Sequence, residues 1–357
     1  MRPLLPRRRP RVLAFLDLVQ DVDVLLPVLL ALRHHAELSA KVLVSRWLER
    51  ESPRTAARLQ AEEIPFSYVR RRDIVEGRAP GLGGIDAVLA ASESSHPAHA
   101  AGHALARRAD GLGLKTYVLQ HGFEQIGLFG PEAPGAEFAS RTVFCWFPPD
   151  AAPADLPSST RAKLAHVGRP SPPGGWARDA TAAYDLGVFE NLHWDRYSDA
   201  DRDLFRAGLV AVARALPQAR ILLRPHPAGG WADRLGHELA PFENIRRLDA
   251  SEARARLEGG AELLKGISRV ITTPSTIALD AALTGAPVAL AAAGGASYAP
   301  VPALDHAEAW VAFASGGAYD PGLLDRFRSR VLVAGDSAPR IVERLRRDLA
   351  RSVATLP

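Results

Sequence analysis

Short apolar runs alternate with amphipathic helical stretches along most of this chain. Parallel strands need a crossover helix between them, so the alternation is typical of parallel sheets covered by helices. The predicted strands are 12–18, 41–44, 85–90, 116–119, 142–146, 165–167, 186–189, 220–223, 269–272 and 287–291. The predicted helices are 24–34, 53–62, 98–109, 201–216, 231–239, 275–283 and 338–353. A chain of 357 residues exceeds what one hydrophobic core usually serves, so two α/β domains are expected.

Prolines and glycines concentrate between residues 148 and 183, which is where a domain boundary is expected. The predicted organisation is a basic flexible arm at 1–10, a Rossmann-like domain at 11–175 and a second one at 176–337. Residues 338–357 form a helix that packs back on the first domain. Two Rossmann-like domains facing a central cleft make the GT-B arrangement, in which ligands bind beyond the carboxyl ends of the strands.

The composition excludes several classes of protein. Apolar residues make up 47% and charged residues 24%, and the net charge of +4 is modest, so neither a disordered chain nor a nucleic-acid binder is expected. Cys145 is the single cysteine, which excludes a disulfide framework and a cysteine-based metal site. No His, Asp or Glu grouping has the spacing of metal ligands. The sequence therefore predicts no metal and no cofactor.

The first residues form an arginine-rich arm interrupted by prolines, with Arg2, Arg7, Arg8, Arg9 and Arg11. The apolar stretch behind the arm is broken by acidic residues, so it is neither an export signal nor a membrane span. The expected location is the cytoplasm. Because a polybasic arm is attracted to anionic lipid, peripheral contact with the inner face of the membrane is a further expectation, and a solvated tail is the alternative.

Two motifs of the second half follow predicted strands. In Arg224-Pro225-His226-Pro227, the prolines restrict the backbone and place the imidazole of His226. The alternative is a loop histidine satisfied by a carbonyl group.

The second motif is Thr273-Pro274-Ser275-Thr276, followed by Asp280 on the same helical face as Thr276. A strand that enters a helix with hydroxyls and free N–H groups in its first turn suits a phosphate or diphosphate. A carboxylate one turn further suits ribose hydroxyls. The alternative is an N-cap at Ser275 and a solvated Asp280.

These motifs resemble those of GT-B transferases that use cytidine-activated donors, including CDP-glycerol glycerophosphotransferases, bacterial sialyltransferases and capsule Kdo transferases. Gln120-His121-Gly122 is similar to the His-Gly motif of the glycerophosphotransferases, and Gly168-Arg169-Pro170 to their interdomain segment. The resemblance spans roughly residues 115 to 290 and concerns the order of motifs.

The resemblance implies a metal-independent transferase that moves a glycosyl or glycerophosphoryl unit from a CMP- or CDP-linked donor to a cell-surface polysaccharide or lipid-linked glycan. The first domain would bind the acceptor and the second the donor. The donor-binding residues would be Arg224, His226, Thr273, Ser275, Thr276 and Asp280. His121 would be the acceptor-side base, a role that an imidazole after a strand end can fill. A histidine buried against the sheet is the alternative.

Further candidates follow the first and third predicted strands. Asp21 and Asp23 are candidate catalytic carboxylates, with a helix-start cap as the alternative. Glu93, Ser95 and His96 are candidate acceptor-side residues. Two other functions stay open on this fold: a nucleotide-sugar epimerase, which needs no acceptor, and a non-catalytic nucleotide-sugar-binding subunit.

Overall fold

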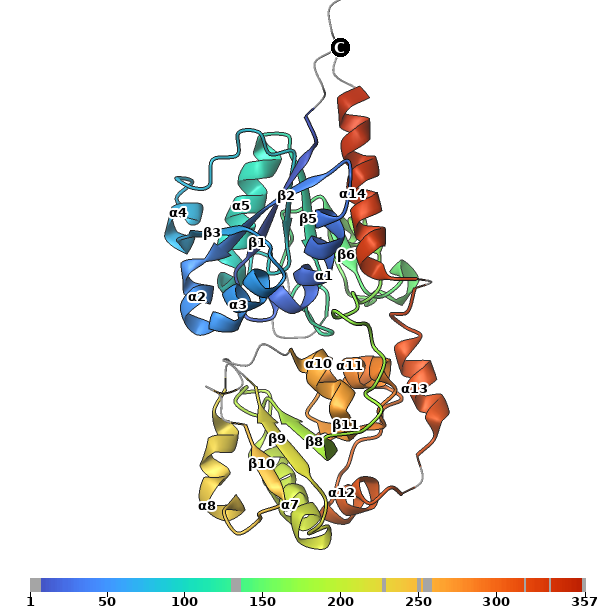
Figure 1. The fold of residues 1–357 in the computed structure, drawn as a ribbon. Helices are drawn as coiled ribbons and strands as arrows, with labels where there is room; N and C mark the ends of the chain where they lie inside the picture. The colour runs from blue at the N-terminus through green and yellow to red at the C-terminus, as the bar shows by residue number, and fades with distance from the viewer. Residues whose placement is uncertain are drawn as a thin grey trace, which may run out of the picture. The chain divides into compact units, whose positions relative to one another are not determined.

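The computed structural model describes residues 8–129, 136–226, 229–248, 252, 259–317, 319–333 and 335–354. The chain divides into two compact units, Met1–Pro173 with Val331–Pro357 (unit 1) and Gly174–Arg330 (unit 2). The boundaries predicted from the sequence were at 175 and 337. Each unit holds a parallel sheet with helices around it, as the α/β prediction requires (Figure 1).

Unit 1 contains a seven-stranded parallel sheet in the order β3-β2-β1-β4-β5-β6-β7. Its strands are β1 (Arg11–Leu16), β2 (Ser39–Ser45), β3 (Phe66–Val69), β4 (Ala87–Ala90), β5 (Lys115–Leu119), β6 (Thr142–Cys145) and β7 (Leu164–His166). Its helices are α1 (Asp21–Arg33), α2 (Arg46–Glu51), α3 (Pro53–Ala61), α4 (Arg71–Val75), α5 (Ala100–Gly111), α6 (Ser158–Arg161) and α14 (Ser337–Ala354). Every residue of β1 after Arg11 is buried, because helices cover both faces of the sheet at its centre.

Helix α14 packs against α1 within unit 1 (Figure 1). Its buried residues Ala338, Ile341, Val342, Leu345 and Leu349 recur at helical spacing and form one apolar stripe. Two polar contacts accompany the stripe: Tyr117 Oη donates to Asp348 (3.2 Å), and Arg346 pairs with Glu37 (3.3 Å).

Unit 2 contains a five-stranded parallel sheet in the order β10-β9-β8-β11-β12. Its strands are β8 (Tyr184–Glu190), β9 (Ile221–Pro225), β10 (Ile245–Arg247), β11 (Ile267–Thr272) and β12 (Val288–Leu290). Its helices are α7 (Asp199–Ala215), α8 (Gly236–Leu239), α10 (Gly260–Leu263), α11 (Thr276–Thr284), α12 (Ala307–Ala314) and α13 (Pro321–Arg328). On one face of the sheet, Phe205 of α7 meets the ring of Trp310 of α12 edge-on at 5.4 Å.

Most of the basic arm, including Arg2 and Arg7, lies outside the described residues. Arg8 is described, and its guanidinium pairs with Asp86 (3.0 Å) and donates to the carbonyl of Gly84 (2.7 Å). Within the described part of the chain, no helix is both long and apolar enough to cross a membrane.

Candidate functional site

Asp17 lies in the loop after β1 and Asp21 begins α1 directly after that loop, at the carboxyl edge of the unit 1 sheet. Asp21 is fully buried; its Oδ2 accepts the backbone N–H groups of Asp17 (2.8 Å) and Leu18 (3.0 Å), and its Oδ1 accepts the hydroxyl of Ser92 (2.5 Å). Burial raises the pKa of Asp21 to about 7. Both oxygens of this predicted catalytic carboxylate are therefore engaged in holding the loop.

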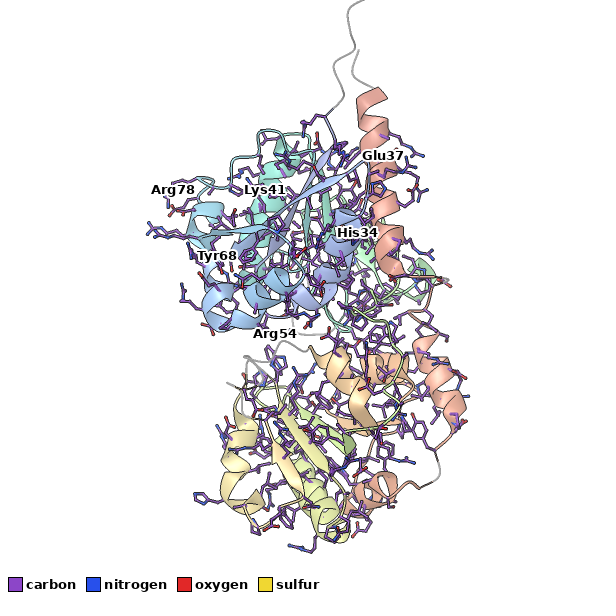
Figure 2. All side chains as sticks on the ribbon, viewed as in Figure 1. His34, Glu37, Lys41, Arg54, Tyr68 and Arg78 are labelled. Atoms are coloured by element: carbon purple, nitrogen blue, oxygen red, sulfur yellow. The ribbon has the colours of Figure 1, made fainter. Side chains whose placement is uncertain are left out.

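Asp23, the second predicted carboxylate, lies in α1 and pairs at 2.6 Å with the buried guanidinium of Arg54, a residue that Figure 2 labels. Asp21 and Asp23 also lie in the first turn of α1, where negative charge complements the helix dipole. These contacts are structural, but neither carboxylate is a helix cap, since Gln20 occupies the N-cap position of α1 and makes no side-chain cap hydrogen bond. A catalytic role for either residue remains a prediction.

The loop after β4 carries the predicted acceptor-side residues. Glu93 is fully buried and tethers a neighbouring loop: it accepts the N–H groups of Ala139 (2.9 Å) and Ser140 (3.1 Å) and contacts His103 Nδ1 (2.8 Å). Ser95 accepts the N–H of Glu137 (2.9 Å), and the ring of His96 accepts the N–H of Ala98 (3.2 Å). Together these residues order the loop.

His121 follows β5 and lies beside a second histidine, His99, which was not among the residues predicted from the sequence. The two rings meet edge-on at 5.5 Å, and His99 Nδ1 lies 2.7 Å from the hydroxyl of Ser94. Burial lowers the pKa of His121 to about 4 and that of His99 to about 3. His121 Nδ1 lies 2.9 Å from the carbonyl of Ala91, which can only accept, so Nδ1 carries the proton and Nε2 the lone pair. This tautomer can accept a proton at Nε2.

In unit 2, three aromatic rings gather at the carboxyl ends of β8 and β9. The ring of His193 lies 5.0 Å from that of His226 and 4.8 Å from that of Trp194. Burial, followed by the nearby His193 and Arg224, lowers the pKa of His226 to about 3. Trp194 is 44% exposed, so it offers an open apolar face beside two neutral imidazoles. Pro227 lies outside the described residues.

Gly229, which follows the motif Arg224-Pro225-His226-Pro227, lies directly against the ring of His193. A Cβ atom on Gly229 would collide with the ring of His193, so only glycine lets the chain pass so close. Arg224, on the strand itself, is largely buried with its guanidinium 6.0 Å from the ring of Phe189.

The loop from β11 to α11 carries the predicted hydroxyl groups. Thr273 Oγ1 accepts the N–H of Asn191 (3.0 Å), and Ser275 Oγ lies 3.1 Å from Thr272 Oγ1. Ser275 occupies the N-cap position of α11 without a side-chain cap hydrogen bond, and Thr276 begins the helix. Asp280 is 4% exposed, so it is not the solvated carboxylate of the alternative interpretation.

The structure brings the predicted residues together in two groups, one in each unit. His121, Asp21, Glu93, Ser95 and His96 lie at the carboxyl edge of the unit 1 sheet, as their positions after β1, β4 and β5 require. Arg224, His226, Thr273, Ser275 and Thr276 lie at the ends of β9 and β11, the two strands that flank β8.

Glu190, the last residue of β8, and His193, three residues beyond it, were not among the residues predicted from the sequence. Glu190 is buried and accepts the N–H of Leu192 (2.7 Å) and of Ala232 (3.3 Å), and burial raises its pKa. Their position directly after a predicted strand was a signal that could have found them. Among the described residues, no group of three or more His, Cys, Asp or Glu side chains could hold a metal ion.

No protein-family model and no curated protein sequence matches the chain. Solved structures resemble it over nearly its whole length. The UDP-GlcNAc 2-epimerase of Neisseria meningitidis, solved with UDP-GlcNAc, has a TM-score of 0.65 and 13% identity, covering 94% of this chain and 100% of the epimerase. The UDP-GlcNAc 2-epimerase of Methanocaldococcus jannaschii, in complex with UDP-GlcNAc and UDP, has a TM-score of 0.62 and 13% identity, covering 94% and 99%. The calicheamicin glycosyltransferase has a TM-score of 0.57 and 14% identity, covering 97% and 100%.

These comparisons correct the function expected from the sequence. The prediction of a transferase with a CMP- or CDP-linked donor is wrong, because the similar structures include several UDP-GlcNAc 2-epimerases, which favour the alternative of an epimerase of the same fold. The physical reason is that imidazoles, hydroxyls and a helix start recognise phosphates and do not read the nucleobase. The fold prediction is confirmed: the chain has the two-domain, parallel-sheet fold of GT-B enzymes, a group that here includes both epimerases and glycosyltransferases.

Proposed function

We propose that this protein is a nucleotide-sugar epimerase that acts on a sugar linked to uridine diphosphate. The observation that carries the proposal is the resemblance to UDP-GlcNAc 2-epimerases over 94% of the chain, one of them solved with UDP-GlcNAc. Unit 2 supplies residues of the type that a nucleoside diphosphate needs, in the loops after β8, β9 and β11.

In this proposal the diphosphate binds at the start of α11. The first turn of that helix offers backbone N–H groups, and Ser275 does not cap them with its side chain. The hydroxyls of Ser275 and Thr276 and the guanidinium of Arg224 add donors. The exposed ring of Trp194 offers a flat apolar surface that suits the nucleobase.

At C-2 of a UDP-linked sugar no neighbouring carbonyl can hold the electron pair of a broken C–H bond. Transfer of the proton to a base would therefore be coupled to cleavage of the bond between C-1 and the diphosphate, with UDP as the leaving group and a double bond left between C-1 and C-2. Return of UDP to C-1 and of a proton to the opposite face of C-2 would then give the epimer. We assign the acceptance of the proton to Nε2 of His121, since Nδ1 is protonated and donates a hydrogen bond to the carbonyl of Ala91. Because the pKa of His121 is about 4, its ring is neutral at physiological pH and needs no prior deprotonation.

The test is incubation of the purified protein with UDP-GlcNAc in D₂O, followed by proton NMR. The expected result is a second isomer and replacement of the hydrogen at the inverted carbon by deuterium. His121→Ala should remove turnover while UDP still raises the melting temperature, and His226→Ala should lose the UDP-induced shift. Stabilisation by CMP or CDP but not by UDP, or exchange unchanged in His121→Ala, would contradict the assignments.

One observation favours a second candidate, a non-catalytic subunit that binds a nucleotide sugar. Four carboxylates near the strand ends of unit 1 already have structural partners: Asp17 with Arg71, Asp21 with backbone N–H groups, Asp23 with Arg54 and Glu93 with His103. An epimerase is expected to place carboxylates around the sugar ring. Binding of UDP-GlcNAc without isomer formation or deuterium exchange would identify this second function.

A further inference from the structure

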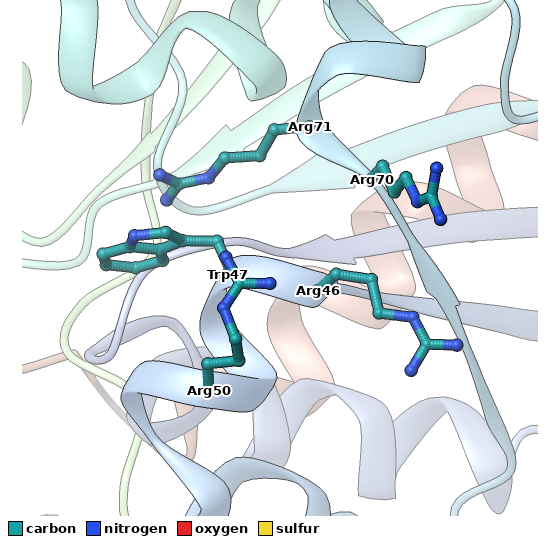
Figure 3. Close-up of a pocket in the computed structure, with 5 residues that line it drawn as sticks. All are labelled: Arg46, Trp47, Arg50, Arg70 and Arg71. Atoms are coloured by element: carbon teal, nitrogen blue, oxygen red, sulfur yellow. The ribbon is translucent and has the colours of Figure 1, made fainter.

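Unit 1 contains a pocket of about 510 Å³ that the proposed function does not use (Figure 3). Four arginines and one tryptophan line it: Arg46, Trp47, Arg50, Arg70 and Arg71. The first three belong to α2, which follows β2 directly, and the last two follow β3. The pocket therefore lies beyond the carboxyl ends of two neighbouring parallel strands, where α/β proteins bind ligands.

The charge in this pocket is only partly balanced. Arg46 pairs with Glu49 (2.8 Å) and Arg71 pairs with Asp17 (2.7 Å). Arg50 and Arg70 are exposed, and in the part of the chain that the structure describes neither side chain makes an ion pair or a hydrogen bond. Two of the four guanidinium groups thus keep their full donor capacity beside one cavity. Clustering of like charges costs free energy that a bound anion would relieve.

The walls of the pocket are held in place. The guanidinium of Arg71 lies over the ring of Trp47, 3.8 Å from its centroid, and is fixed on its other side by the buried Asp17. The guanidinium of Arg46 lies 4.4 Å from the centroid of the ring of Tyr68, a residue that Figure 2 labels. Stacking and ion pairing reduce the conformational entropy that these side chains would lose on binding.

We propose that this pocket binds a ligand carrying a phosphate group, held by Arg50 and Arg70 and flanked by Arg46 and Trp47. Guanidinium groups donate two parallel hydrogen bonds to adjacent phosphate oxygens, and two free ones beside a cavity match a doubly charged phosphate. The residues of this site belong to unit 1, whereas those of the proposed diphosphate site belong to unit 2. Its ligand is a free phosphorylated molecule or the phosphate of a lipid headgroup, which present the same chemistry.

The test is isothermal titration of the full-length protein with inorganic pyrophosphate. The double variant Arg50→Ala/Arg70→Ala removes the two unpaired guanidiniums without breaking an ion pair. The matched control, Arg107→Ala/Arg214→Ala, removes two exposed arginines on α5 and α7 whose side chains also make no ion pair or hydrogen bond within the described chain. Pyrophosphate bound at the unit 2 site would appear equally in all three proteins.

The expected result is that the double variant binds pyrophosphate at least tenfold more weakly than wild type at one site, whereas the control binds like wild type. Equal isotherms for wild type and the double variant, including no heat from either, would overturn the proposal. Co-sedimentation with phosphatidic acid vesicles, with phosphatidylcholine vesicles as the control, distinguishes the two sources of the phosphate group. Sedimentation of wild type that is lost in the double variant indicates a lipid headgroup. Pyrophosphate binding without sedimentation indicates a free phosphorylated ligand.

Discussion

At the residue scale, Asp21 couples stability to pH. Its folded pKa of about 7 exceeds the ordinary value of 3.8, so the folded state holds a proton that the unfolded chain releases. Its stabilising contribution is therefore complete below pH 3.8 and is lost as the pH rises through 7. In Asp21→Asn the group cannot ionise, and its amide can still accept the loop N–H groups.

We therefore expect the stability of wild type, measured relative to Asp21→Asn by urea denaturation, to fall by about 2 to 3 kcal/mol between pH 5 and pH 8. Ser92→Ala should extend the fall in stability to higher pH, because the hydrogen bond from the Ser92 hydroxyl lowers the pKa of Asp21 and its loss would raise that pKa further. Parallel pH profiles for wild type and Asp21→Asn would show that Asp21 keeps an ordinary pKa.

The same residues show how far the sequence predicts the site. His121, Glu93 and His226 were identified because apolar runs reveal where strands end, and parallel strands end at one edge of a sheet. Their partners could not be identified that way. Glu93 is committed to the N–H groups of Ala139 and Ser140, far along the chain, and no local pattern encodes that tertiary contact.

At the scale of elements, the packing of α7 against α12 depends on Gly208. A Cβ atom there would collide with the ring of Trp310, which is fully buried. Alanine favours a helix by about 1 kcal/mol over glycine, but overpacking a core costs about 1 to 3 kcal/mol. We therefore expect Gly208→Ala to lower the melting temperature. Gly111→Ala, whose Cβ atom meets nothing within 4 Å, is the control and should leave it unchanged or raise it slightly.

Helix α14 offers a second test, because its two faces differ. Leu345 is fully buried in unit 1, so Leu345→Ala should cost about 2 to 5 kcal/mol in the free energy of unfolding. Among the described residues, the side chain of Arg347, on the exposed face, makes only an i,i+4 ion pair with Glu343 at 3.5 Å. Arg347→Ala should therefore change stability by less than about 0.5 kcal/mol. Similar costs for the two variants would mean that the helix does not dock as described.

The elements also show which parts of the fold the sequence reveals. The prediction of a helix at 338–353 matches α14 (Ser337–Ala354), because its apolar stripe is long and regular. Strand β3 (Phe66–Val69) was not predicted, since only Val69 of its four residues is buried and the strand lacks an apolar run. Because β3 was not predicted, the arginine pocket was not predicted either: Arg70 and Arg71 indicate a site only once they are known to follow a strand.

At the scale of the whole molecule, motif order predicted the fold but not the donor. The GT-B arrangement follows from two series of alternating strands and helices, and this alternation extends over most of the sequence. The choice between cytidine and uridine depends on a few contacts to the base, which motifs for phosphate binding do not contain.

The connectivity of the two units leads to a prediction about their folding. Unit 2 is one continuous segment with its own sheet and core, whereas unit 1 is completed by the residues after Val331. A fragment of residues 174–330 should therefore unfold cooperatively in urea and show a dispersed NMR spectrum.

A fragment of residues 1–173 lacks α14, so the apolar surface of α1 that α14 covers would be open to water. That fragment should aggregate alone and become soluble when it is co-expressed with residues 331–357. A soluble, cooperatively folded 1–173 fragment would contradict this, and would mean that the burial of Leu345 and its neighbours stabilises α14 without being needed by the rest of unit 1.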